Sequence, residues 1–245
     1  MKKLFLAPIA LAAVLFATPA SGVVVLTEPF SYSNGPLIDV SGGLWSTHSG
    51  NTPGQVDVTS GVVNIVASET EDVNRLLTPV GTSFVSGTLS ATFDVNFSAL
   101  PNATGTYFTH FKDATASGFR GRLFATTTGA ATGTFRLGIA DTTATFTPLA
   151  VDLSLGTPYS ITLNLDVATG RSSFSVAGQG GLITATDATS FLGISTYALR
   201  QATGEGTLIF DNLIVNATEA AVPEPSTTIA LLSGLGLLGL LRRRS

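Results

Sequence analysis

Cysteine is absent from this 245-residue sequence, and histidine occurs only twice. Without cysteine the chain has no disulfide bridge, no thiol catalysis and no cysteine metal site. His48 and His110 are too few for a histidine-rich metal site, and neither H-E-x-x-H nor G-x-S-x-G occurs. The sequence therefore predicts no metal ligands and no catalytic residues.

Charged residues are also scarce, at 11% of the chain, and they are unevenly distributed. Five of the twelve basic residues lie at the two ends, as Lys2, Lys3 and the cluster Arg242, Arg243 and Arg244. Residues 23–221 hold 7 basic and 15 acidic side chains, a net charge of −8. Nucleic-acid-binding proteins gain much of their affinity from Lys and Arg on phosphates, so this acidic body argues against a nucleic-acid partner.

The first 22 residues, MKKLFLAPIALAAVLFATPASG, have the three parts of a secretory signal peptide. A basic start is followed by an apolar stretch from Leu4 to Ala17 and by small residues suited to signal peptidase. A buried N-terminal helix is the alternative. We expect residues 1–22 to form a signal helix that is removed, so that the exported protein begins near Ser21 or Val23.

A second apolar stretch, residues 227–241, lies close to the C-terminus. As a helix its 15 residues would span roughly 22 Å, against a hydrocarbon core of about 30 Å. Its GLGLLG matches the dinucleotide fingerprint G-x-G-x-x-G, but no strand precedes it and no acidic residue follows, which excludes a nucleotide site. We expect a short transmembrane helix, with residues 242–245 as a basic cytoplasmic tail.

The order of motifs at this end resembles the PEP-CTERM sorting signal of exported Gram-negative bacterial proteins. Pro223, Glu224 and Pro225 lie in the predicted linker 219–226, the apolar helix follows, and Arg242, Arg243 and Arg244 end the chain. The resemblance implies recognition by an exosortase, a membrane-embedded cysteine protease-transpeptidase, during passage through the inner membrane. It also implies removal of the tail and delivery to the cell surface or matrix, often beside exopolysaccharide. A plain tail anchor is the alternative.

Strand patterns dominate residues 23–218, which we expect to form one domain. In TLSATFDVNF the apolar residues alternate with polar ones, as in a half-buried antiparallel strand. YSITLNLDV repeats the pattern, and the turn ATG leads into RSSFSV, which predicts a hairpin. Further strands are predicted at residues 55–58, 62–66, 105–112, 118–125, 134–140, 192–199 and 207–215. Together they predict an all-β fold, a two-sheet antiparallel β-sandwich.

Two stretches of the body, DLSLGTPYSITLNLDVATGRSSFSVAG and GTLIFDNLIV, are similar to the concanavalin A-like lectin/glucanase jelly roll. The resemblance implies a jelly-roll arrangement of the two sheets. Many jelly rolls hold calcium, but no loop here has the D-x-[DN]-x-[DN]-G spacing of a calcium loop. No cofactor is therefore expected.

The segment SETED contains the carboxylates of Glu69, Glu71 and Asp72. Jelly-roll glucanases pair an acid and a nucleophile about 5.5 Å apart, and residues two apart on a strand face the same side. The later acid of that pattern is missing, because Asn74 and Arg75 follow. We interpret the segment as a solvated acidic turn, with a divergent glycan-active hydrolase using these carboxylates as the alternative.

Basic residues gather between positions 112 and 136. Period-2 spacing predicts that Phe108, His110 and Lys112 share one strand face, and that Arg120, Arg122 and Phe124 share another. The connection DATASG would pair the two strands and bring these faces together. Arg136 on the next strand, with Trp45 and His48 from a loop, would extend the face. The candidate ligand-binding residues are Trp45, His48, His110, Lys112, Arg120, Arg122 and Arg136.

The bland alternative is a solvated outer strand face, and for the single tryptophan a place in the core. The sequence favours a non-enzymatic exported module that binds exopolysaccharide or serves in the matrix. A structural matrix protein without a ligand is a further hypothesis.

Overall fold

The computed structural model describes residues 22–218, with gaps at 51, 80 and 116. The predicted signal helix, linker, transmembrane helix and basic tail lie outside these residues, apart from Gly22. In the part that is described, no helix is long and apolar enough to cross a membrane. The described residues belong to one compact unit, in which the only helix is the four-residue α1 (Leu37–Val40).

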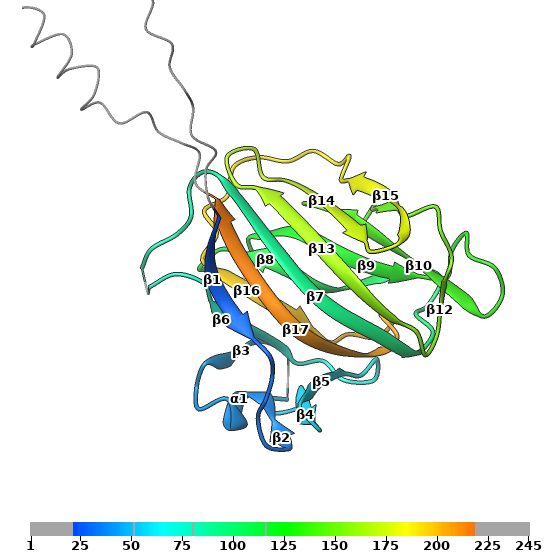
Figure 1. The fold of residues 1–245 in the computed structure, drawn as a ribbon, viewed down its shortest axis with the longest axis horizontal. Helices are drawn as coiled ribbons and strands as arrows, with labels where there is room; N and C mark the ends of the chain where they lie inside the picture. Colours follow the sequence, from blue (N-terminus) through cyan, green and yellow to red (C-terminus); the bar gives the residue numbers. More distant parts are fainter. Residues whose placement is uncertain (1–21, 51, 80, 116, 219–245) are drawn as a thin grey trace, which may run out of the picture. The chain divides into compact units, whose positions relative to one another are not determined.

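Two antiparallel sheets pack face to face in this unit (Figure 1). The front sheet contains, in spatial order, β15 (Gln179–Thr184), β14 (Arg171–Val176), β13 (Pro158–Asp166), β7 (Thr88–Ala99), β17 (Thr207–Thr218), β5 (Val62–Ile65), β4 (Asp57–Thr59) and β2 (Gly35–Pro36), and β1 (Val23–Glu28) also pairs with β17. The back sheet contains β11 (Thr147–Pro148), β10 (Thr134–Ala140), β9 (Phe119–Thr126), β8 (Thr106–Lys112), β16 (Thr196–Arg200), β6 (Asp72–Leu76) and β3 (Trp45–Ser49), with β12 (Leu153–Ser154) beside β10.

The alternation seen in the sequence places one side of each long strand in the core. In β7, Leu89, Ala91, Phe93, Val95 and Phe97 are all buried, and the residues between them are only partly covered. Strand β13 pairs with β7 over nine residues and has the same alternation. The predicted all-β, two-sheet sandwich is confirmed, as is the hairpin from β13 to β14.

Aromatic rings from both sheets meet in the core between them. Phe93 stacks on Phe210 of the same sheet, with ring centroids 4.6 Å apart, and lies 6.4 Å from Tyr197 of the back sheet. Phe97 lies 4.4 Å from Phe135 on β10. Each of these rings is 2% exposed or less, so burial of large apolar surfaces holds the sheets together.

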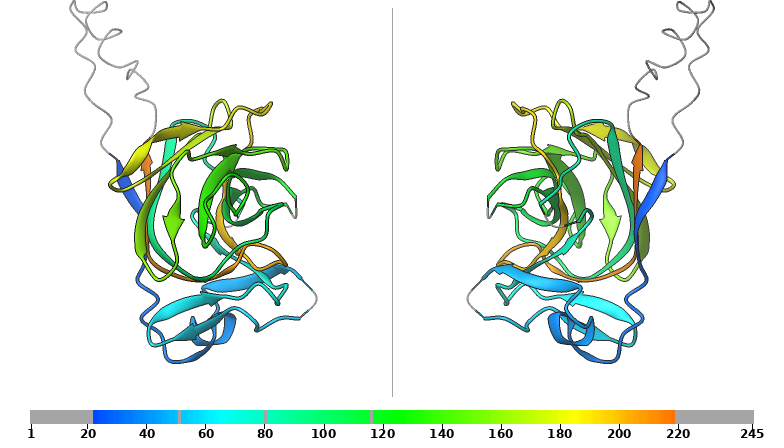
Figure 2. Two further views of the ribbon diagram at one scale, coloured as in Figure 1. Left: turned by 90° about the vertical axis from the view of Figure 1, so that its right-hand side faces the viewer. Right: turned by 90° about the vertical axis from the view of Figure 1, so that its left-hand side faces the viewer.

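An N-terminal segment covers one end of the sandwich, where α1 and strands β2 to β5 lie below the long strands (Figures 1 and 2). Here the buried carboxylate of Glu28 accepts hydrogen bonds from the Phe30 amide at 3.0 Å, the Tyr32 hydroxyl at 2.8 Å and the Trp45 indole at 3.0 Å. Arg75 forms an ion pair with the same carboxylate. Trp45 is 1% exposed and packs on Phe30, so its predicted place on a binding face is corrected to the core.

The chain enters and leaves the body at neighbouring strands. Val23 of β1 pairs with Ala217 of β17, and the two strands run side by side in Figure 1. A Cβ atom on Gly22 would lie 3.3 Å from the hydroxyl of Thr218. Both ends of the described chain therefore lie at one edge of the front sheet.

Several strands were not predicted from the sequence, among them the apolar β1, strand β15 and short strands such as β3 and β6. Residues 45–49 were expected to be a loop and form β3, while Asp72 begins β6. The expectation of a solvated acidic turn at SETED is wrong, because Glu71 is 0% exposed and Asp72 is 8% exposed. Both carboxylates are retained in the interior by hydrogen bonds, as buried charges must be.

Candidate functional site

The outer side of the back sheet gathers aromatic and basic side chains from four strands. We call this surface the aromatic–basic face. It consists of His48 on β3, Tyr107 and His110 on β8, Phe119, Arg122 and Phe124 on β9, and Arg200 on β16. Strands β9, β8 and β16 are hydrogen-bonded neighbours, which brings side chains distant in sequence onto one surface.

Tyr107 lies at the centre of the face between two guanidinium groups. The guanidinium carbon of Arg200 is 4.2 Å from the centroid of its ring, and that of Arg122 is 5.3 Å away. Arg122 also lies over Phe124, at 5.7 Å. Such cation–π contacts hold the cations against the rings. Tyr107, Arg122 and Arg200 are all partly exposed, so their outer atoms are accessible to a ligand.

Two neutral imidazoles lie beside this centre. The rings of His48 and His110 are 6.1 Å apart, and His110 is 5.4 Å from Tyr107 and 4.5 Å from Phe119. Burial, with help from Lys112, lowers the pKa of His48 to about 4. Burial lowers the pKa of the fully enclosed His110 well below its ordinary value. Both imidazoles are therefore uncharged at neutral pH, and neither ring has a hydrogen-bond partner among the described residues. The partly exposed His48 ring adds to the surface, whereas the enclosed His110 ring packs against Tyr107 and Phe119.

Two local irregularities decide which side chains reach the face. The pairing of β8 with β9 shifts register between Tyr107 and Phe111, and Gly121 has a φ of +63°. A β-bulge of this kind changes which residues point to each side. Phe108 therefore packs on Phe97 in the core, at 5.7 Å. The predicted sharing of one face by Phe108, His110 and Lys112 is wrong for Phe108.

The second irregularity, at Gly121 on β9, removes Arg120 from the face. Its Nε and Nη2 atoms donate to the Ser190 carbonyl at 3.2 and 2.9 Å, and the residue is 8% exposed. We predicted that Arg120, Arg122 and Phe124 share one face of β9. This is wrong for Arg120, because the left-handed backbone conformation at Gly121 interrupts the alternation of side chains. Phe119, one position earlier, takes its place beside His110.

The remaining predicted residues lie on the same sheet but apart from its centre. Arg136 on β10 forms an ion pair with Asp152, with Nε and Oδ1 2.6 Å apart. Lys112 pairs in register with Thr196 on β16, at the opposite end of β8 from Tyr107. The structure therefore brings His48, His110 and Arg122 together, places Lys112 further along the face, and keeps Trp45, Arg120 and Arg136 out of the cluster.

The carboxylates of the hydrolase hypothesis are occupied by structural hydrogen bonds. Glu71 accepts from the amides of Gly54, Gln55 and Val56 at 3.0, 2.7 and 2.8 Å, and from the Thr47 hydroxyl. Asp72 accepts from the Ser49 hydroxyl at 2.6 Å and lies 3.7 Å from Arg200. Glu69 accepts from the Gln201 side-chain amide at 2.8 Å. These groups fasten loops and orient Arg200.

Sequence patterns missed Tyr107, Phe119 and Arg200. Arg200 follows the predicted strand 192–199 directly, and Ala198, two residues earlier, pairs with His110. An antiparallel pairing of β16 with β8 would have placed Arg200 near Tyr107, but pairing partners cannot be deduced from alternation in single strands.

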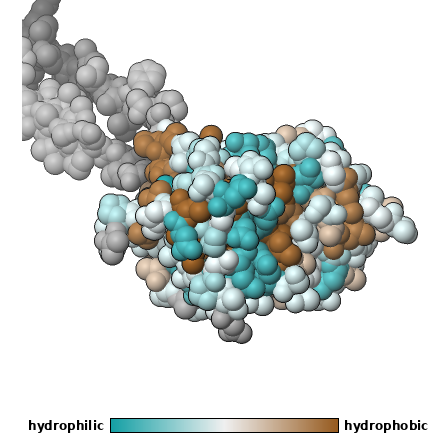
Figure 3. Space-filling model, turned by 90° about the horizontal axis from the view of Figure 1, so that it is seen from below, coloured by the Kyte–Doolittle hydropathy of each residue, from teal (hydrophilic) through white to brown (hydrophobic). Residues whose placement is uncertain are grey.

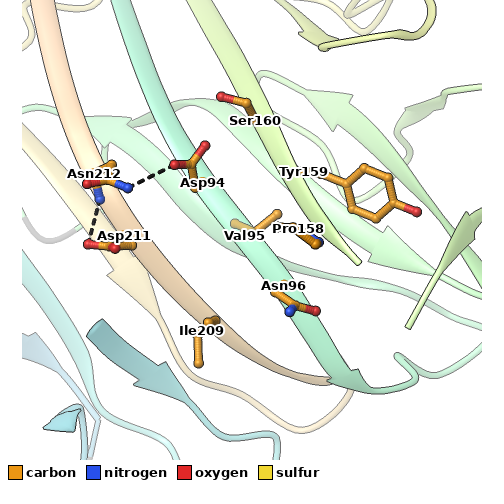
Figure 4. A pocket seen from close by; sticks show the side chains of 9 residues that line it. All are labelled: Asp94, Val95, Asn96, Pro158, Tyr159, Ser160, Ile209, Asp211 and Asn212. Carbon is orange, nitrogen blue, oxygen red and sulfur yellow. Dashed lines mark hydrogen bonds between the residues drawn. The ribbon is translucent and has the colours of Figure 1, made fainter. Parts of the chain in front are cut away.

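A separate cavity of about 350 Å³ opens on the outer side of the front sheet (Figure 4). Asp94, Asn96 and Asp211 point into it, and Asn212 donates to Asp94 at 2.9 Å. The register shift between Asp211 and Ile214 accompanies a φ of +55° at Asn212. This cavity carries carboxylates and amides without a cation, in contrast to the aromatic–basic face.

Figure 3 shows hydrophobic side chains on one face in separate bands between hydrophilic ones. Within residues 22–218, gaps excepted, no cluster of three or more His, Asp or Glu side chains is placed to hold a metal ion.

Comparisons with known proteins agree with both the tail and the fold. The chain carries the PEP-CTERM protein-sorting motif, which matches at residues 221–245. No relative among curated proteins matches the chain. The CBM2 module of the evolved Dit protein of Lactobacillus casei BL23 phage J-1 is a similar solved structure, with 11% identity, a TM-score of 0.54 and coverage of 84% of this chain and 100% of that one.

A second similar structure is the polysaccharide lyase aly-SJ02 of family 18, with 10% identity, a TM-score of 0.50 and coverage of 73% of this chain and 97% of that one. At such identities the likeness shows the fold alone. The chain thus carries the sorting motif of exported, exosortase-sorted proteins, and its body has the fold of a two-sheet antiparallel β-sandwich.

Proposed function

We propose that the body is a non-enzymatic polysaccharide-binding module of the cell surface or extracellular matrix. The observation that carries the proposal is the ring of Tyr107 held between Arg122 and Arg200 on an outward-facing sheet surface. Aromatic rings offer an apolar platform to the C–H faces of sugars, and guanidinium groups donate to hydroxyl or carboxylate oxygens. Arg122 donates through Nη2 to the Thr143 carbonyl but forms no ion pair with a described residue, so its charge is not neutralised by a carboxylate.

Affinity for polysaccharide should fall when the two guanidinium groups are removed. We expect Arg122→Gln and Arg200→Gln each to weaken binding roughly tenfold, because a charge-assisted hydrogen bond contributes about 1.5–3 kcal/mol. Titration of the exported protein against a panel of acidic and neutral polysaccharides by isothermal calorimetry measures the change.

Arg136→Gln is the matched control, because Arg136 lies on the same sheet but outside the aromatic–basic face, where it pairs with Asp152. It should bind as the unmodified protein does. Equal affinities for all three variants would contradict the proposed surface, and no binding to any polysaccharide would favour the structural matrix hypothesis.

The hydrolase alternative has a direct measurement of its own. Release of reducing sugar from the same polysaccharides would show that the protein is an enzyme. The occupied carboxylates of Glu69, Glu71 and Asp72 support the non-enzymatic proposal.

The tail gives a separate prediction about processing. If an exosortase removes the segment after the Pro223–Glu224–Pro225 motif, replacing all three residues by alanine should leave the tail attached and the protein in the membrane fraction. Intact-mass spectrometry of the cell-surface and membrane fractions distinguishes the two forms. Thr227→Ala, which lies within the matched region 221–245 but outside the three replaced residues, is the control, and equal shortening of both variants would count against exosortase processing.

A further inference from the structure

A second cavity of the sandwich lies on the back sheet, and we infer that it is a subsite for the carboxylate of a uronic acid residue. The ligand of the proposed binding surface would then be an acidic polysaccharide. This inference rests on the proposed function above. The cavity, which we call the lysine pocket, has a volume of about 340 Å³, and its lining includes Lys112, Ser46, Asn74, Ser195, Leu44 and Leu76.

Lys112 is a buried cation without an anionic partner in the described part of the chain. The residue is 3% exposed, and its Nζ donates to the backbone carbonyl of Asp113 at 3.1 Å. No described carboxylate lies within ion-pair distance of it. The nearby Asp113 carboxylate is engaged with the amide and hydroxyl of Thr115, at 2.8 and 2.7 Å. An ammonium has three donors and is costly to bury unpaired, so an incoming anion would be favoured here.

Other polar groups around Lys112 are suited to oxygen atoms. The hydroxyl of Ser195 is buried and has no hydrogen-bond partner among residues 22–218 as described. Ser46 donates to the carbonyl oxygen of the Asn74 side chain at 3.0 Å, which orients that amide so that its NH₂ group is the donor. A carboxylate accepts hydrogen bonds only, so this set of donors matches it.

The size and the walls of the pocket favour a sugar acid over a small inorganic ion. Leu44 and Leu76 line it and are 52% and 49% exposed, so part of its wall is apolar and open to solvent. Apolar walls pack against the C–H groups of a sugar ring, whereas inorganic phosphate would leave them in water. A single lysine also balances one negative charge, which is the charge of a uronate and less than that of phosphate at neutral pH.

The lysine pocket lies on the same sheet surface as the aromatic–basic face. Lys112 and Tyr107 are five residues apart on β8, roughly 16 Å along a strand, and His110 lies between them. His110 lies two residues from Lys112 on the same strand, and the His48 ring is 6.1 Å from His110, so the two regions adjoin. One linear chain can therefore contact Lys112 with one sugar unit and Tyr107 with another, and carboxylates repeated along it would meet Lys112, Arg122 and Arg200.

The test compares glucuronate with glucose, which differ at the carboxylate, as ligands of the full-length protein in a detergent without a sugar headgroup. Titration followed by ¹H–¹⁵N NMR should show at least tenfold preference for glucuronate, with shifts at Asn74 and Ser195. We expect Lys112→Met to lose this preference and Arg136→Gln to keep it. If Lys112→Met does not fold, Leu76→Trp, at an exposed position on the pocket wall, should block glucuronate instead.

The outcomes separate the two proposals. Binding of glucuronate through Lys112 without any polysaccharide binding would support the pocket and overturn the proposed function. A second outcome is polysaccharide binding that depends on Arg122 and Arg200 but comes with no preference for glucuronate over glucose. A third is a preference for glucuronate that is unchanged in both Lys112→Met and Leu76→Trp. Either of these would overturn the pocket and leave the proposed function in place. If the unmodified protein binds neither polysaccharide nor glucuronate, the proposed function and the pocket are both overturned.

Discussion

Replacing Glu28 with alanine should destabilise the body by about 3–5 kcal/mol, the usual cost of breaking a buried ion pair. The side chain is 2% exposed and joins β1 to the N-terminal segment through Phe30, Tyr32, Trp45 and Arg75. Without it, the Trp45 indole and the Phe30 amide lose their acceptor in the interior, and each unsatisfied donor costs about 1–3 kcal/mol. Urea unfolding followed by tryptophan fluorescence measures the loss, because Trp45 is the only tryptophan.

Asp39→Ala is a matched control, since Asp39 is an exposed carboxylate on α1 in the same segment. It should change the free energy of unfolding by less than about 0.5 kcal/mol. A Glu28→Ala protein as stable as this control would show that the network contributes little and that packing alone holds Trp45 in place.

Glu205 should make stability fall as the pH rises. It is fully buried, one oxygen accepts from the Ala202 amide at 2.7 Å, and the other has no partner among the described residues. Burial raises the pKa of this carboxyl from 4.5 to about 7. The folded state then holds the proton more tightly than the unfolded state does. The resulting stabilisation is complete below pH 4.5 and is lost as the pH rises through about 7, by up to about 3 kcal/mol.

The measurement compares the protein with Glu205→Gln, which stays neutral at every pH. The difference in the free energy of unfolding between the two should change by up to about 3 kcal/mol from pH 4.5 to pH 8. The lowered pKa of His48 acts in the opposite direction, because a neutral buried imidazole costs stability as the pH falls below 6.5. His48 is present in both proteins, so the difference isolates Glu205. If the free energies of unfolding of the two proteins change with pH in parallel, Glu205 is not the source of the pH dependence.

The long strands could be predicted because each carries a clear alternation. Residues 134–140 were predicted as a strand and form β10 with the same bounds, and the core positions of β7 were all placed correctly. Strands β3 and β6 were missed because they are short and most of their residues are polar. Their stability comes from pairing with each other and with β16, a long-range property that local patterns do not contain.

The candidate site could be predicted only in part, for a similar reason. Alternation correctly placed His110 and Arg122 on the outer side of the sheet, but the bulge at Gly121 redirected Arg120 and the register shift in β8 turned Phe108 inward. A bulge adds one residue to one strand, and nothing in the alternating pattern of GFRGRLF reveals it before the partner strand is known. Arg200 entered the site through pairing across 90 residues of sequence, from Thr109 to Leu199.

The sorting motif and the proposed binding surface thus lie in separate parts of the chain. The motif occupies residues 221–245, and the back sheet of the sandwich presents the surface on which we place the ligand. The two outward surfaces of the sandwich differ in chemistry. Aromatic rings with cations mark the back sheet, and carboxylates with amides mark the cavity of the front sheet.

Mapping the bound ligand tests this account most directly. We would titrate an acidic oligosaccharide into ¹⁵N-labelled protein and record which backbone amides shift. The account predicts that the largest shifts cluster on β8, β9 and β16 around Tyr107, Arg122 and Arg200. Shifts confined to the front-sheet cavity around Asp94 and Asp211, or no shifts at ligand concentrations that saturate binding, would contradict it.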